Sequence, residues 1–235
     1  LLAVMAGMYA VYHGKDGLKY IADRVHSLTV TIANALTSLG FEQTNTSFFD
    51  TITVNVDAKK LKAVAEENNI NFNYIDDNTV SISVNETVSL KEINEIVDCF
   101  KLAFNVDETP VTTLSTSEKI TDNLLRNTSF LDNEIFNTFR SETDMMRYIK
   151  KLERKDLALN HSMISLGSCT MKLNAASEML PLSNPQWGNI HPFVPLNQAE
   201  GYQEVLKKLE HQLNVITGFA GTSLQPNSGA QGEFA

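Results

Sequence analysis

Apolar residues recur at steps of three and four near the start of the chain, and this pattern predicts a long amphipathic helix. The helix is expected over residues 16–39, and Gly40 ends it. Its apolar stripe is formed by Leu18, Ile21, Val25, Leu28, Ile32 and Leu36. A shorter helix runs from the first residues to Gly14, so we expect the chain to open with two consecutive helices.

Apolar and polar residues alternate in the next part of the chain, which predicts short strands. The alternation covers residues 51–56, 70–74 and 80–84. Asp76-Asp77-Asn78 lies between the last two segments and favours a turn. These two segments are therefore predicted to form a hairpin.

Two helix starts accompany the strands. Asp57 is placed to cap one helix, and Ser89 with Glu92 has the spacing of a capping box before another. Together with the strands, these helices predict that residues 1–105 form a small α+β domain with at least one antiparallel pair. Residues 106–140 are predicted to be a linker, because the stretch after Pro110 has no apolar period.

Amphipathic helices return in residues 141–235. Ser141 and Asp144 mark the start of one that ends near Asp156. Its inward residues are expected to be Met145, Met146, Ile149 and Leu152. A later helix ends at Gly218 and precedes a short strand over Thr222–Leu224. The residues that this helix is expected to turn inward are Tyr202, Val205, Leu206, Leu209, Leu213 and Ile216.

The composition narrows the class of protein. The chain has 235 residues, of which 43% are hydrophobic, and a formal net charge of −9, which argues against a nucleic-acid surface. Its dense basic group, Lys150, Lys151, Arg154 and Lys155, is typical of a solvated helix face. Two cysteines are too few for a disulfide framework or a metal cluster, and a reducing cytoplasm fits them best. The apolar start of the chain is too short to cross a membrane.

Gln225–Glu233 is the most suggestive stretch for binding. Its small residues allow a tight turn into a helix start, where unpaired amides could hold an anion such as a phosphate. On spacing alone, an ordinary loop with a glycine-rich helix start is the more common explanation. The stretch matches neither of the usual glycine-rich phosphate motifs.

Residues 162–195 are rich in Ser, Asn, Gly and Pro, and long ordered loops of this kind tend to be functional. Within them, Cys169 could act as a nucleophile only with a histidine base such as His161 or His191. Lys172 is the lysine of this loop that could form a Schiff base, although nothing around it argues for a lowered pKa. A catalytic thiol, a lining segment and a plain loop all stay open.

Several motifs in order resemble the P-protein of the glycine cleavage system. They are Glu142–Tyr148, Leu152–Asp156, Ser165–Asn174, Gln198–Tyr202 and Gln225–Glu233. Tyr9–His26 also resembles this family, and residues 40–130 do so only loosely. The family is a pyridoxal-phosphate-dependent glycine decarboxylase with two homologous halves, each similar to a fold type I, aminotransferase-like enzyme. The resemblance implies an α/β fold with α+β parts.

The resemblance also implies an organisation and a chemistry. Residues 1–105 would close the first half, 106–140 would connect the halves, and 141–235 would begin the catalytic second half. Pyridoxal phosphate would serve as the electron sink for loss of CO₂ from glycine. The aminomethyl group would pass to the lipoamide of the H-protein, and the full-length enzyme would be a homodimer.

Individual site residues follow from the same resemblance. Those matching the cofactor's phosphate cradle are Ser228, Gly229, Ala230 and Gln231. Those matching a segment near the substrate entrance are Ser165, Cys169 and Thr170, with His191 as a weaker match. The family's Schiff-base lysine lies in a His-Lys motif downstream of Ala235, so we expect an internal fragment that is inactive by itself.

Two other classes of function stay open at this point. A non-catalytic structural or interaction subunit of a split P-protein would share much of the sequence but not the segments that resemble the catalytic half. An unrelated phosphate-binding protein would be distinguished by whether pyridoxal phosphate or a generic nucleotide protects it from thermal unfolding.

Overall fold

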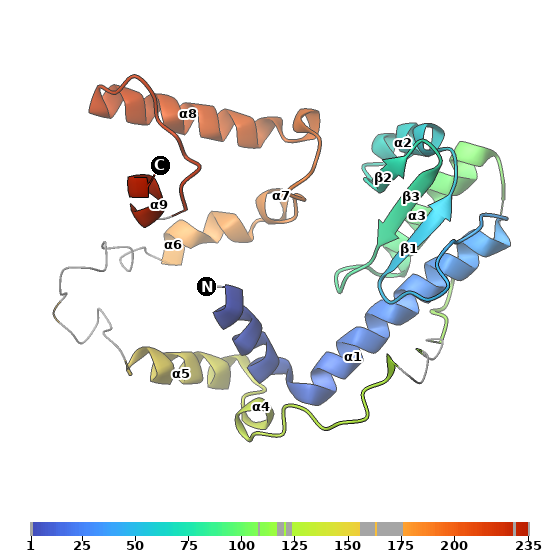
Figure 1. Ribbon diagram of the computed structural model, residues 1–235, viewed down its shortest axis with the longest axis horizontal. Helices are drawn as coiled ribbons and strands as arrows, with labels where there is room; N and C mark the ends of the chain where they lie inside the picture. The colour runs from blue at the N-terminus through green and yellow to red at the C-terminus, as the bar shows by residue number, and fades with distance from the viewer. Residues whose placement is uncertain are drawn as a thin grey trace. The chain divides into compact units, whose positions relative to one another are not determined.

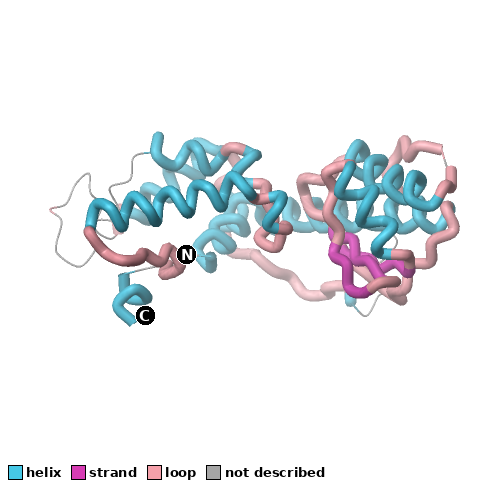
Figure 2. The backbone as a smooth tube through the Cα atoms, turned by 90° about the horizontal axis from the view of Figure 1, so that it is seen from above, coloured by secondary structure: helices cyan, strands magenta, loops and turns pink. Residues whose placement is uncertain are grey.

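The structure, a computed structural model, describes residues 2–107, 109–116, 120, 124–155, 163, 176–227 and 229–234. The chain divides into two compact units, Leu1–Lys150 and Lys151–Ala235. Figure 2 distinguishes their helices and strands. The first unit contains α1 (Leu2–Ser38), β1 (Thr51–Asn55), α2 (Ala58–Glu67), β2 (Asn73–Asp76), β3 (Thr79–Ser83), α3 (Leu90–Phe104), α4 (Ile135–Thr138) and most of α5 (Glu142–Glu153). The second contains α6 (Ala176–Met179), the 3₁₀ turns η3 (Leu180–Ser183) and η4 (Leu196–Gln198), α7 (Pro185–Gly188), α8 (Glu200–Thr217) and α9 (Gly229–Phe234).

A three-stranded antiparallel sheet of order β1-β3-β2 lies in the first unit. Val80 is opposite Val54 on β1 and Tyr74 on β2. The predicted hairpin between β2 and β3 is confirmed, and its turn is fixed by the Asn78 amide, which donates to Asp76 Oδ1 at 2.8 Å. The second strand begins at Asn73, later than the alternation from Ile70 predicted.

The core lies where helices pack on this sheet (Figure 1). The predicted stripe of α1 is confirmed from Val25 onward, where Leu28, Ile32 and Leu36 are fully buried, whereas Leu18 and Ile21 are half-buried. They share one apolar cluster with the inward strand residues and with one face of α3. The structure is therefore a mixture of helices and a small antiparallel sheet, as the sequence predicts for residues 1–105.

Both predicted helix caps of this unit are present. Asp57 accepts the Lys60 amide at 3.0 Å at the start of α2. Ser89 and Glu92 form a capping box at the start of α3, in which Glu92 Oε2 accepts the Ser89 amide at 2.9 Å. Both caps provide acceptors for amides that the first turn of a helix leaves unpaired.

A break interrupts α1 at Gly14, as the sequence predicts. Gly14 has φ 62° and ψ −175°, a conformation open to glycine but rarely to other residues. The two arms of the helix meet there, and Figure 1 shows α1 turning sharply where α4 lies beside it. Arg140, just before α5, donates to the carbonyls of Val11 and Tyr12 at 2.9 Å each.

The inward face of α5 differs from the prediction. Met145 and Tyr148 are buried, whereas Met146 and Ile149 are exposed by 64% and 47%. The ring of Tyr148 stacks on Phe139 with centroids 4.2 Å apart. This stack turns the 145 and 148 positions inward, so the neighbouring stripe through Met146 and Ile149 faces outward.

The second unit also departs from the sequence pattern. The predicted inward stripe of α8 is exposed or half-buried, with Ile216 exposed by 78%, and none of the described residues of this unit is buried. An amphipathic stripe predicts burial only where another element covers it. Within the predicted loop over 162–195, the described residues form α6, η3 and α7. Pro181 and Pro185 stand in the first turn of η3 and α7, where a proline needs no amide partner.

Candidate phosphate-binding site

The approach to the predicted anion turn starts at the end of α8. Gly218 adopts a left-handed conformation with φ 74°, and its amide donates to Asn214 at 2.8 Å. Thr222 Oγ1 then donates to Asn214 Oδ1 at 2.6 Å, which holds the following segment against the last turns of α8. The segment over Thr222–Leu224 forms no strand, so that prediction is wrong.

The turn itself leads into a helix, as predicted. The helix, α9, begins at Gly229 and has six residues. The Asn227 amide donates to Gln231 Oε1 at 2.8 Å, so the side chain of Gln231 reaches back over the start of the helix. Ser228, one of the four predicted cradle residues, lies outside the described residues.

The described part of this turn offers backbone amides to an anion but no positively charged side chain. The amides of Gly229 and Ala230 stand in the first turn of α9, where a helix offers no internal acceptor, and both residues are exposed. A carbon added at Gly229 would meet no atom within 4 Å, so a ligand can approach the backbone there. Glu233 is the charged residue of this stretch, and a phosphate would be held by neutral amides rather than by a cation.

His191 has a defined hydrogen bond. Its Nδ1 accepts the Phe193 amide at 3.1 Å, and the two rings lie 5.7 Å apart. In the neutral ring the proton is therefore carried by Nε2, which is left as a donor. The residue is exposed.

The other predicted residues of the long loop cannot be placed. Ser165, Cys169 and Thr170 lie outside the described residues, as do His161 and Lys172. The thiol nucleophile and the lining segment therefore stay predictions.

The other cysteine, Cys99, lies in α3. It is a free thiol in the core with an exposed fraction of 1%. Burial, together with the carboxylates of Asp98 and Glu95, raises the pKa of the thiol. A reactive cysteine needs a lowered pKa and access, so Cys99 is a packing residue.

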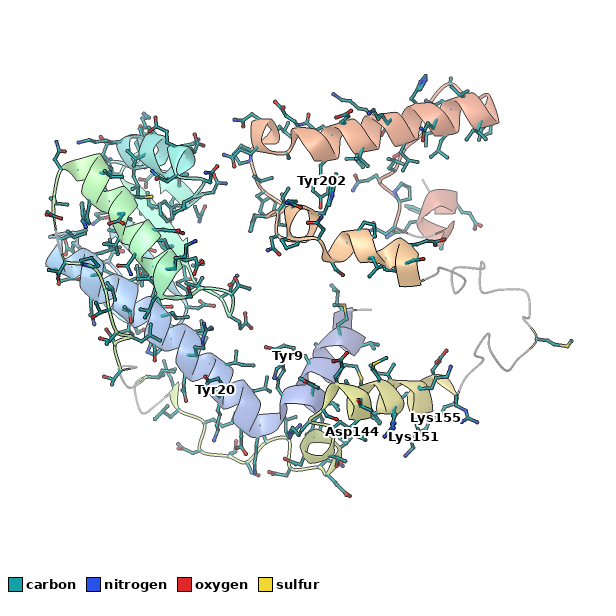
Figure 3. All side chains as sticks on the ribbon, turned by 180° about the vertical axis from the view of Figure 1, so that it is seen from behind. Tyr9, Tyr20, Asp144, Lys151, Lys155 and Tyr202 are labelled. Atoms are coloured by element: carbon teal, nitrogen blue, oxygen red, sulfur yellow. The ribbon has the colours of Figure 1, made fainter. Side chains whose placement is uncertain are left out.

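Tyr202 has a contact that the sequence analysis missed. It was assigned to the apolar stripe of α8, but its hydroxyl donates to the carbonyl of Trp187 and its ring packs edge-on against Trp187 at 4.9 Å. Figure 3 labels Tyr202 on α8. The sequence does carry a signal for this contact between α7 and α8. Tyr202 stands in the first turn of a helix, and Trp187 lies shortly before that helix.

The described residues contain neither a cluster of metal ligands nor a helix that could span a membrane. No group of three or more His, Cys, Asp or Glu side chains is arranged there to hold a metal ion. No helix in the described part of the chain is both long and apolar enough to span a membrane.

The fold and the turn define a protein of mixed α and β structure with a glycine-rich helix start suited to an anion. Residues 1–100 match the family described as glycine cleavage system P-protein. These residues of the chain are thus similar to this family. The family match covers the part in which the sequence motifs showed a looser resemblance, and the relatives below extend it to the whole chain.

Relatives match along the full length of the chain. It is 65% identical to the glycine dehydrogenase (decarboxylating) of Flavobacterium johnsoniae and 63% identical to that of Christiangramia forsetii, over all 235 residues. Identity to the protein of the same name from Bacteroides thetaiotaomicron is 48% over the whole chain. The chain spans about a quarter (25%) of the length of each of these relatives.

Proposed function

We propose that this chain is part of an enzyme that decarboxylates glycine. The observation that carries the proposal is the 65% identity, without a gap in coverage of the chain, to a protein named glycine dehydrogenase (decarboxylating). Identity at this level over a whole chain supports a shared fold and a shared reaction. The same similarity argues against the alternative of a non-catalytic structural subunit and against an unrelated phosphate-binding protein.

The proposed reaction balances with two partners. The bond between the two carbons of glycine breaks and releases CO₂, and the remaining aminomethyl carbon forms a bond to sulfur of a lipoyl group on the H-protein. The electron pair of the broken carbon–carbon bond reduces the lipoyl disulfide. Its S–S bond breaks, one sulfur binds the aminomethyl carbon, and the other becomes a thiol by taking up a proton. We propose a homodimer of the full-length enzyme as the assembly, and fold type I as the fold of each half.

Pyridoxal phosphate is the proposed cofactor, and it would supply the electron sink for decarboxylation. The described amides of Gly229 and Ala230 fit its phosphate as donors, and Ser228 and Gln231 are proposed to complete the cradle. The Asn227 amide already has an acceptor in Gln231, so these two residues shape the turn.

The loop before α8 is proposed as a wall of the substrate entrance. Ser165, Cys169 and Thr170 would contribute small polar groups there, and His191 could donate from Nε2 to a carboxylate such as that of glycine. The proposed division into a domain over 1–105, a connection over 106–140 and a catalytic part from 141 follows the same family. In this division the cradle and the wall belong to one half.

The proposal can be tested with a proline in the cradle. Ala230→Pro removes one amide at the first turn of a helix, where proline keeps the backbone conformation. In the natural polypeptide that contains this sequence, we expect the dissociation constant for pyridoxal phosphate to rise about 10- to 100-fold, since a hydrogen bond to a charged group contributes about 1.5–3 kcal/mol. Release of labelled CO₂ from glycine in the presence of lipoylated H-protein should fall in parallel at limiting cofactor.

Two controls make this test specific. Ala230→Ser keeps the amide and should bind the cofactor as the parent does. Pyridoxal, which lacks the phosphate, should bind the proline variant and the parent equally. Parent protein that releases no CO₂ from glycine would overturn the proposed function, and unchanged affinity of the proline variant would remove residues 229–231 from the cradle.

A further inference from the structure

The break in α1 is a place where a helix could be continuous but is not. The residues around it, Tyr12-His13-Gly14-Lys15-Asp16, contain no proline, and a glycine in a helix costs only about 1 kcal/mol relative to alanine. In an unbroken helix the carbonyls of Val11 and Tyr12 would accept the amides of Lys15 and Asp16. Gly14 permits the predicted break, but a glycine alone does not require the observed bend.

Arg140 takes the place of those helical donors. Its Nη1 donates to the carbonyls of Val11 and Tyr12 at 2.9 Å each, and its Nη2 donates to the carbonyl of Phe136 in α4. A side chain that inserts into the hydrogen-bond ladder of a helix is a known cause of sharp kinks. The space is closely fitted, because a carbon added at Gly14 would fall on the guanidinium of Arg140 and lie 2.5 Å from the carbonyl of Phe136.

Further contacts cross the same bend. Lys15, on the second arm of α1, pairs with Asp132 at 3.6 Å. Tyr9, on the first arm, donates to Glu86 Oε1 at 3.3 Å, an exposed and long hydrogen bond. Arg140 directly precedes Ser141, which caps α5 by accepting the Asp144 amide at 3.1 Å. Arg140 therefore contacts the bend of α1 and directly precedes the residue that caps α5.

We propose that Gly14 and Arg140 form a conformational latch that selects between a bent and a straight α1. With the guanidinium inserted, the helix is bent and the segment over 131–140 is held against it. When Arg140 leaves, the freed carbonyls take back the amides of Lys15 and Asp16 and the helix straightens. Arg140 is exposed, so water can replace the protein as its hydrogen-bond partner and the exchange is reversible.

Distances between two spin labels on α1 test the latch in the 235-residue chain. Cysteines replace Met5 and Tyr20, which are exposed by 59% and 69% and lie on opposite sides of Gly14; Figure 3 labels Tyr20. Cys169→Ser removes the other candidate for labelling, because Cys99 is buried. In a straight helix the Cα atoms of two residues fifteen positions apart are separated by about 22 Å, and any bend between them shortens this distance.

Two substitutions act on the latch and two serve as matched controls. Arg140→Gln and Gly14→Ala should each shift the label distance toward that of a straight helix, with helix content by circular dichroism unchanged or higher. Arg126→Gln removes an exposed arginine that lies before the segment over 131–140, and Gly7→Ala changes a glycine of α1 that has no atom within 4 Å of an added carbon. Both controls should keep the parent distance.

Specific results would overturn the proposal. If Arg140→Gln and Gly14→Ala give the same distance distribution as their controls, the bend does not depend on the latch. If Gly14→Ala fails to fold, Arg140→Gln decides alone. Loss of cooperative unfolding in both Arg140→Gln and Arg140→Lys would also reject a reversible latch, because it would make the arginine essential for folding.

Discussion

Single side chains determine where the helices of the first unit begin. At the start of α3, Glu92 accepts the amide of Ser89 at 2.9 Å and also receives the serine hydroxyl. These hydrogen bonds favour the ionised carboxylate, and the one from the serine side chain is the largest cause of the lowered pKa of Glu92. The cap thus couples the stability of α3 to the charge of one residue.

A pH dependence follows from this lowered pKa. Because the folded pKa lies below that of the unfolded chain, the stabilisation is present above the unfolded pKa and is lost as the pH falls through the folded pKa. Glu92→Gln keeps the capping geometry but cannot titrate, so we expect its urea-unfolding midpoint to fall less than that of the parent between about pH 5 and pH 3. Glu95→Gln, one turn later, is the control. If its urea-unfolding midpoint falls as little with pH as that of Glu92→Gln, the pH dependence does not come from the cap.

At the scale of elements, α3 is the helix on which the core depends. Its side chain Phe100 is fully buried, with ring centroids 5.1 Å from Phe41 and 6.1 Å from Phe72. Phe41 lies in the loop between α1 and β1, and Phe72 lies in the loop between α2 and β2. One aromatic ring therefore holds segments together that are far apart in the sequence.

Removing this ring should be costly. Phe100→Ala is expected to lower the free energy of unfolding by about 3–5 kcal/mol, since it leaves a cavity that the neighbours fill only in part. Leu102→Ala, on the exposed side of the same helix at 62% exposure, should change it by no more than about 0.5 kcal/mol. Urea unfolding of both variants measures the difference, and similar values for the two would show that α3 is not packed as described.

The elements also show what could be predicted from the sequence. Asp57 and Ser89 were found because capping is a local interaction, and β2–β3 was found because its turn residues and alternation lie within a few positions. Met146 and Ile149 were wrongly placed inward because a helical period admits two adjacent stripes, and the choice was made by Phe139, which lies outside the helix. The role of Arg140 at Gly14 could not be predicted, since it joins residues more than a hundred positions apart.

At the scale of the whole molecule, the two units differ in how much they bury. The apolar cluster of the first unit gathers residues from α1, α2, α3, β1 and β3, and Tyr74 of β2 packs against it. The described residues of the second unit include no buried side chain, although α8 has a strong apolar stripe. The stripe was correctly recognised as amphipathic, but what covers an apolar face is a property of the tertiary structure and not of the helix alone.

Hydrogen exchange of the 235-residue chain should reveal this difference directly. Helices α3 and α8 have 15 and 18 residues, so length alone would favour α8. Without packing, however, a helix of this length is only marginally stable in water, and the i, i+4 pair of Glu204 with Lys208 adds little. Amides in α3 open only with the core, whereas those in α8 open locally. We therefore expect protection factors at least about 100-fold larger in α3 than in α8, measured amide by amide. Comparable protection in both helices would show that the stripe of α8 is covered in solution.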